Sequence, residues 1–138
     1  MIKSYFYHLQ VNINFKKNIQ FYTDLMEFLG WKRIFEEGED QQGFKSNTNG
    51  DIWFVQSLKN DWADYDNVGL SHFAIRVKGQ SDVDKVLAFI KSKGTKALFD
   101  TPRHRPEFAS TEKETYYQII FESPDKIQIE IVYIGPKI

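Results

Sequence analysis

A histidine lies in the same setting in two short segments of this chain, Tyr7-His8-Leu9-Gln10-Val11 and Ser71-His72-Phe73-Ala74-Ile75. Each segment has the strand-like alternation that is typical of a sheet with one buried face. A helical pattern follows each strand and ends at a glycine. Gly30 and Gly94 each lie 22 residues after their histidine. The equal spacing indicates one structural unit used twice along the chain.

Each unit is predicted to contain one helix and four strands, in the order β-α-β-β-β. In the first unit, Asn14 or Asn18 is expected to cap a helix that stops at Gly30. In the second unit, Ser81 or Asp82 takes the capping role. The strands are expected at residues 5–13, 32–36, 43–47 and 51–56, and then at 70–77, 96–99, 116–122 and 127–133. The fold class is therefore predicted as α+β, with two β-α-β-β-β modules forming a curved mixed sheet cup and the helices outside.

Length and composition favour one compact domain over residues 1–138. It is expected to consist of module 1 at about residues 5–56, a polar linker at 57–68 and module 2 at about 69–134. Cysteine is absent, which suits a reducing cytoplasm. The formal net charge of −1 predicts no electrostatic attraction to nucleic acid or membranes. No signal peptide and no run of roughly 20 apolar residues is found, so we expect a cytoplasmic protein.

Strand alternation separates an apolar face from a polar one. Successive side chains of a strand point to opposite sides of the sheet. The apolar positions should pack under the helices, while His8, His72 and Glu130 fall on the other faces. A sheet face with such polar content must meet water or a binding site. If the sheet curls into a cup, these groups converge.

Two histidines and one carboxylate form a known ligand set for a divalent metal. A facial triad of His8, His72 and Glu130 with open positions suits Fe(II), Mn(II), Zn(II) or Ni(II). Open positions leave room for water or for two oxygens of a substrate, so that the metal can act as a Lewis acid. The ordinary alternative is a pair of hydrogen-bonded strand histidines and a solvent-facing glutamate. The residues by themselves leave both interpretations open.

Three segments resemble the vicinal oxygen chelate superfamily, which includes glyoxalase I, extradiol dioxygenases, and fosfomycin- and bleomycin-resistance proteins. Residues 8–31, with Phe28-Leu29-Gly30-Trp31, are similar to its opening module, and residues 70–75 to the start of its second module. Residues 121–130 are similar to its closing motif, although Ser123-Pro124-Asp125-Lys126 replaces the usual Asp-Pro-Asp-Gly turn. The overall pattern is most similar to small bacterial members.

The resemblance implies metal ligands at His8, His72 and Glu130. The fourth position of the family pattern falls on Trp53, where glyoxalase I-like members carry a carboxylate or related ligand that takes part in proton transfer. An indole can neither bind a metal nor move a proton. The resemblance therefore implies a three-ligand site without ordinary glyoxalase I activity.

Other residues are candidates for contact with a substrate. Trp53 and Tyr117 could form an aromatic wall, Gln10 shares the polar strand face with His8, and Arg103 could meet an anionic substrate. The segment 103–105, flanked by prolines, is interpreted either as a stiff lid or as a solvated turn. The sequence assigns no catalytic residue, with Tyr117 and His104 as the candidates. For Tyr117 the alternative is ordinary core packing.

Two classes of function remain open at this point. The first is a metal-dependent enzyme of lyase, dioxygenase or transferase type, whose small-molecule substrate chelates the metal through vicinal oxygens. The second is a metal-free protein that binds or sequesters a small molecule, as bleomycin-resistance members do. The three candidate ligands together favour the enzyme. A homodimer is possible in either class.

Overall fold

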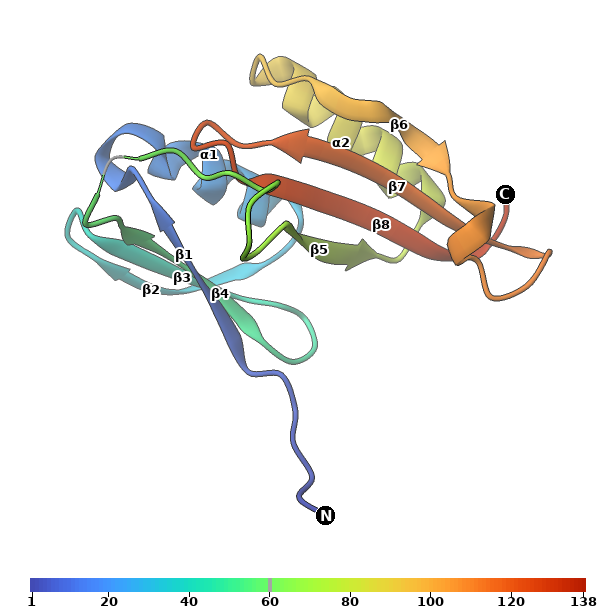
Figure 1. The fold of residues 1–138 in the computed structure, drawn as a ribbon, viewed down its shortest axis with the longest axis horizontal. Helices are drawn as coiled ribbons and strands as arrows, with labels where there is room; N and C mark the ends of the chain where they lie inside the picture. Colours follow the sequence, from blue (N-terminus) through green and yellow to red (C-terminus); the bar gives the residue numbers. More distant parts are fainter. Residues whose placement is uncertain (60) are drawn as a thin grey trace. The chain divides into compact units, whose positions relative to one another are not determined.

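The computed structural model describes residues 1–59 and 61–138. The chain divides into two compact units, Met1–Asp61 (unit 1) and Trp62–Ile138 (unit 2). Each unit has one four-stranded sheet and one α-helix (Figure 1). The boundary falls in the predicted linker, of which Asn60 lies outside the described residues. The assignment of both modules to one domain stays a prediction.

Unit 1 has the predicted order β-α-β-β-β. Its elements are β1 (His8–Ile13), α1 (Phe15–Phe28), β2 (Lys32–Glu37), β3 (Gln41–Lys45) and β4 (Asp51–Gln56). The sheet order is β1-β4-β3-β2, with β1 parallel to β4 and the other neighbours antiparallel. Gly30 follows α1 in the left-handed conformation, with φ of 79°, as its place in the sequence predicts.

Unit 2 repeats this order with longer strands. Its elements are β5 (His72–Val77), α2 (Gln80–Ser92), β6 (Ala97–His104), a 3₁₀ turn η1 (Pro106–Phe108), β7 (Glu114–Glu122) and β8 (Gln128–Pro136). The sheet order β5-β8-β7-β6 matches that of unit 1, again with one parallel pair, β5 and β8. Gly94 ends α2 with φ of 72°, like Gly30 in unit 1. The predicted α+β class and the twofold use of one unit are confirmed.

The two parallel pairs share one register. In unit 1, Gln10 of β1 lies opposite Trp53 of β4. In unit 2, Ala74 of β5 lies opposite Glu130 of β8. Gln10 and Ala74 each come two positions after the histidine that opens their strand. Trp53 therefore holds in unit 1 the position that Glu130 holds in unit 2.

Each helix covers an apolar sheet face. In unit 1, Tyr22 of α1 packs against Phe54, with ring centroids 4.5 Å apart, and both side chains are fully buried. In unit 2, Val83, Val86 and Ile90 form the buried stripe of α2. The buried strand residues of unit 2 are Phe121, Ile129 and Ile131, among others. Because side chains alternate along a strand, this packing leaves the opposite face of each sheet for the polar residues.

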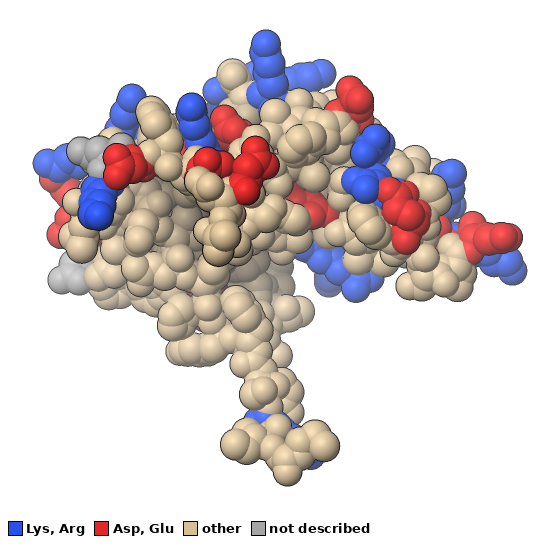
Figure 2. Space-filling view, in the orientation of Figure 1, with Lys and Arg blue, Asp and Glu red and all other residues tan. Residues whose placement is uncertain are grey.

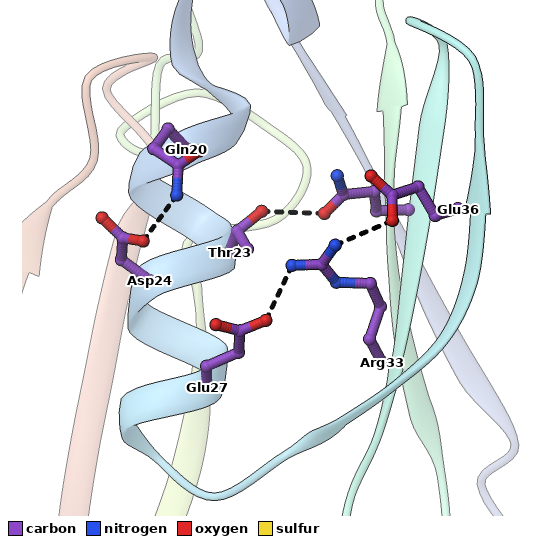
Figure 3. Close-up of polar contacts among 7 residues, drawn as sticks. Gln20, Thr23, Asp24, Glu27, Arg33 and Glu36 are labelled. Carbon is purple, nitrogen blue, oxygen red and sulfur yellow. Dashed lines mark hydrogen bonds and ion pairs between the residues drawn. The ribbon is translucent and has the colours of Figure 1, made fainter.

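Polar contacts also tie α1 to its sheet (Figure 3). The Thr23 hydroxyl donates to Gln42 Oε1 at 2.7 Å, and both residues are buried. Arg33 of β2 bridges Glu27 of α1 and Glu36 of its own strand, with nitrogen to oxygen distances of 2.7 and 2.8 Å. These three side chains are partly exposed, so the bridge contributes less than a buried contact would.

Thr23→Val is expected to lower the free energy of unfolding by about 1–3 kcal/mol, because it leaves the buried Gln42 oxygen without its donor. Gln20→Ala on the same helix is the control, since Gln20 is exposed and donates to the half-buried Asp24 carboxylate (Figure 3). We expect its effect to stay within about 0.5 kcal/mol. Urea denaturation of both variants measures the difference, and equal effects would contradict the role of the Thr23 hydroxyl.

Some local predictions differ from the structure. The α2 N-cap is Gly79 rather than Ser81 or Asp82, and its amide donates to the Asp82 carboxylate at 3.1 Å. The sixth strand runs to His104 instead of ending at residue 99. The strand continues through Pro102, because β6 is an edge strand with a register shift between Leu98 and Arg103, where proline is tolerated.

The surface carries both signs of charge. On the face drawn in Figure 2, acidic and basic side chains are interspersed, in keeping with the net charge of −1. None of the helices in the described parts of the chain combines the length and the apolar character needed to cross a membrane.

Candidate functional site

The polar face of the unit 2 sheet centres on Glu130. This glutamate, the third residue of β8, is only 3% exposed. Its Oε2 lies 3.0 Å from Nε2 of His72, the first residue of the neighbouring strand β5. The His72 side chain is 36% exposed, so the pair has one buried member and one that reaches solvent. A buried carboxylate needs partners, and this one has several.

The other oxygen of Glu130 accepts two hydrogen bonds from β7. The Tyr116 hydroxyl donates to Oε1 at 2.6 Å. The Gln118 amide nitrogen, in the amide orientation that satisfies both of its ends, donates to the same oxygen at 2.8 Å, and its carbonyl accepts from Arg105 at 3.1 Å. Burial, and then the bond to Glu130, raises the pKa of Tyr116. The phenol therefore keeps its proton and remains the donor.

His72 has a polar partner at each ring nitrogen. Nδ1 lies 3.1 Å from the Ser71 hydroxyl, which can donate or accept. When Ser71 accepts, Nδ1 carries the proton and Nε2 presents its lone pair on the side of Glu130. A hydrogen bond of this kind to the second nitrogen orients most metal-binding histidines.

The chemistry of this pair fits a divalent cation. An imidazole nitrogen and a carboxylate oxygen are ligands that Zn(II), Fe(II), Mn(II) and Ni(II) accept. Two ligands that shared such an ion, each about 2.1 Å from it, would lie about 3.0–3.4 Å apart. The Nε2 to Oε2 distance of 3.0 Å meets this requirement. Among residues 62–138, all of them described, no third His, Cys, Asp or Glu joins the pair.

His8 opens β1 of unit 1 as His72 opens β5 of unit 2. It is exposed, and its ring meets the edge of Tyr7 with centroids 5.1 Å apart. Gln10 is also exposed and donates to Asn12. His8 therefore has the strand position and the accessibility of a ligand within its own unit, and its role stays a prediction.

Trp53 is built into the unit 1 sheet. Its indole lies over Gly43, the residue opposite it on β3, where an added Cβ would come within 3.0 Å of three ring atoms. Its Nε1 donates to Asp51 at 2.7 Å, and its ring centroid lies 5.3 Å from that of Phe35. The glycine makes room for the indole, so position 53 is occupied by a fixed, half-buried aromatic group.

Tyr117 and His104 lie on the other face of the unit 2 sheet from Glu130. The Tyr117 hydroxyl donates to Asp84 of α2 at 2.7 Å, and burial, followed by this bond, raises the pKa of Tyr117 to about 12. His104 stacks on Tyr117 and contacts Thr115, and burial, followed by Lys137, lowers the pKa of His104. The structure separates this pair from Glu130, because odd-numbered β7 residues face the helix.

Arg103 lies on the edge strand β6, opposite Gln118. It therefore shares the Glu130 face and is exposed. Residues 103 and 104 belong to strand β6, so they form neither the stiff lid nor the solvated turn that the sequence suggested. Arg103 is thus an exposed cation on the edge strand beside this face, and its contact with a substrate stays a prediction.

The sequence model of the Glyoxalase/Bleomycin resistance protein/Dioxygenase superfamily matches residues 7–131. This chain belongs to that superfamily. The match spans both units and includes all three predicted ligand positions. A search of curated proteins found no significant match.

Solved structures of superfamily proteins share the fold. A candidate glyoxalase from Bacillus halodurans matches with a TM-score of 0.75 and 22% identity over 93% of this chain and 94% of that one. A glyoxalase/bleomycin resistance protein from Albidiferax ferrireducens has a TM-score of 0.69 and 15% identity, covering 92% and 96%. A fosfomycin resistance protein from Listeria monocytogenes has a TM-score of 0.61 and 19% identity, covering 96% and 92%. At these identities the likeness establishes the fold alone.

Three residues around Glu130 were not assigned to its site by the sequence reasoning, namely Tyr116, Gln118 and Arg105. Strand parity, together with the pairing across the turn after β7, is the signal that finds Tyr116 and Gln118. Glu122 pairs with Gln128 across the turn at 123–127, so even-numbered residues of β7 share a face with even-numbered residues of β8. Of the two adjacent tyrosines, Tyr116 is the one beside Glu130.

Proposed function

We propose that this chain is a divalent-metal-dependent enzyme of the superfamily, acting on a small molecule that chelates the metal through vicinal oxygens. Lyase, dioxygenase and transferase chemistry all fit such a site. A cytoplasmic location and a homodimer remain predictions from the sequence. The alternative, a metal-free binding or drug-sequestering protein, is distinguished by the metal experiment below.

One observation carries the proposal, the pairing of His72 with the buried Glu130. Their ligand atoms lie 3.0 Å apart, and the carboxylate is fixed by two further donors. A glutamate that simply faced solvent would be neither buried nor held by two hydrogen-bond donors. The sequence predicts His8 as the third ligand, and the superfamily resemblance implies the same three residues.

The candidate site residues have separate roles in this proposal. His72 and Glu130 hold the ion, which when bound polarises the chelating oxygens of the substrate as a Lewis acid. The Ser71 hydroxyl, 3.1 Å from Nδ1, orients the His72 ring. Arg103, exposed at the rim of the same face, attracts an anionic group of the substrate. Trp53 and Gln10 of unit 1 remain proposed substrate contacts.

Metal analysis of protein purified without chelators, followed by titration with Zn(II), Ni(II) and Mn(II), tests the proposal. We expect one equivalent per chain in the wild type. His72→Ala should weaken binding by more than about a hundredfold, which exceeds the usual effect of residues outside the ligand shell. His104→Ala is the matched control, because this histidine lies on the helix side of the sheet. His8→Ala decides whether His8 is the third ligand.

Binding should also weaken on acidification, because protonated imidazole has no lone pair for a metal. Unchanged affinity in His72→Ala would contradict the proposed ligand. A wild type that takes up no metal but binds aromatic or glycopeptide-like small molecules would favour the metal-free alternative.

A further inference from the structure

We propose that Tyr116 and Gln118 are positioning residues that hold one oxygen of Glu130, so that the carboxylate offers only its other oxygen to the metal. This inference rests on the proposed function, because the metal is the group that receives the free oxygen. It adds two residues of β7 to a site that the superfamily resemblance places on His8, His72 and Glu130 alone.

The two oxygens of Glu130 have different surroundings. Oε1 accepts from the Tyr116 hydroxyl at 2.6 Å and from the Gln118 amide at 2.8 Å, which occupies both of its lone pairs. Oε2 faces Nε2 of His72 at 3.0 Å. A carboxylate held in this way binds an ion through one oxygen, because turning to present both would break two hydrogen bonds in a buried site.

A further layer of contacts holds the two donors in place. Arg105 donates to the Gln118 carbonyl, which fixes the amide so that its nitrogen faces Glu130. The Arg105 guanidinium lies 4.7 Å from the Phe108 ring centroid, and Phe108 meets the edge of Tyr116 at 5.4 Å. Both donors are thus oriented by one cluster from β7 and the segment 105–108. Gln118 is 2% exposed, so water offers little replacement for its amide.

Loss of either donor is expected to weaken metal binding by freeing the Glu130 carboxylate, rather than to weaken packing. Without the Tyr116 hydroxyl, Oε1 has only one partner, and the carboxylate can rotate about its last bond. Rotation spreads Oε2 over positions that do not suit an ion held by His72. Substitutions in such supporting residues commonly cost 10–100-fold in metal affinity. The ring of Tyr116 remains in Tyr116→Phe, so the fold keeps its apolar contacts.

The experiment compares Tyr116→Phe with Tyr117→Phe, the same change one residue along the strand. We expect Tyr116→Phe and Gln118→Met each to weaken Zn(II) and Co(II) binding by about tenfold or more in competition titrations with a chelating dye. Tyr117→Phe, which loses a bond to Asp84 on the other face, should stay within about twofold of the wild type. The visible spectrum of the Co(II) form is the second readout, because it reports coordination geometry and does not respond to distant packing. It should change in Tyr116→Phe and Gln118→Met only.

The possible failures are distinguishable. A wild type that binds no metal overturns the proposed function and this inference with it. A wild type that binds metal and loses it in His72→Ala, while Tyr116→Phe and Gln118→Met match the wild type in affinity and Co(II) spectrum, overturns the positioning role alone. Equal losses in Tyr116→Phe and Tyr117→Phe also overturn it, since they would show a general loss of stability.

Discussion

Replacing Phe54 or Phe121 with alanine is expected to lower the free energy of unfolding by about 3–5 kcal/mol. Each ring is fully buried at the centre of one unit, and Phe54 contacts both Tyr22 and Phe44. The loss combines the transfer of apolar surface with a cavity that the packed helix cannot fill. The free energy of unfolding of a protein domain is about 5–15 kcal/mol in total, so either substitution removes a large share of it.

The same pair of variants tests whether the two units form one domain. If they do, urea unfolding should be a single transition by circular dichroism and by tryptophan fluorescence, and each variant should shift all of it. Two separate transitions, each moved by only one variant, would contradict the prediction of a single domain. Phe99→Ala is the control in unit 2, because this ring is 53% exposed and its loss should cost less than about 0.5 kcal/mol.

The sequence was sufficient for the architecture because its signals are local. Alternation, helical periodicity and the glycines that end the two helices, Gly30 and Gly94, each act within a few residues, and the 22-residue spacing repeats them. Errors arose where the tertiary setting decides. Proline is uncommon inside strands, but Pro102 lies within β6, which is an edge strand with a register shift. The Gly79 cap was missed because Asp82 acts from three residues inside the helix.

The candidate site was predictable in part for a similar reason. Alternation alone placed Glu130 and His72 on non-helical faces, and the parallel pairing of β5 with β8 brings their side chains within contact. The choice between Tyr116 and Tyr117 depends on the register across the turn after β7, which a single strand does not encode. Arg105 acts through an amide on another strand, so no sequence spacing pointed to it.

The wild-type protein is expected not to isomerise the methylglyoxal–glutathione adduct, whichever of Fe(II), Mn(II), Zn(II) or Ni(II) is supplied. The register of the parallel pairs sets Trp53 in unit 1 where Glu130 stands in unit 2. The superfamily resemblance implies that glyoxalase I uses a carboxylate at that position in proton transfer. Loss of a positioned proton-transfer group typically costs about 10²–10⁴-fold in rate. Trp53 cannot be displaced easily, because its indole covers Gly43 and bonds to Asp51.

Asp51 is a carboxylate of unit 1 that could substitute, because it lies opposite His8 on β4. Its Oδ2 accepts from the Trp53 indole at 2.7 Å, which ties it to the aromatic group rather than to a substrate. Turnover should therefore be absent in the wild type, measured beside an authentic glyoxalase I under the same metal conditions. Efficient turnover that disappears in Asp51→Asn would show that Asp51 takes over proton transfer. Efficient turnover that survives Asp51→Asn would show that position 53 does not limit the chemistry.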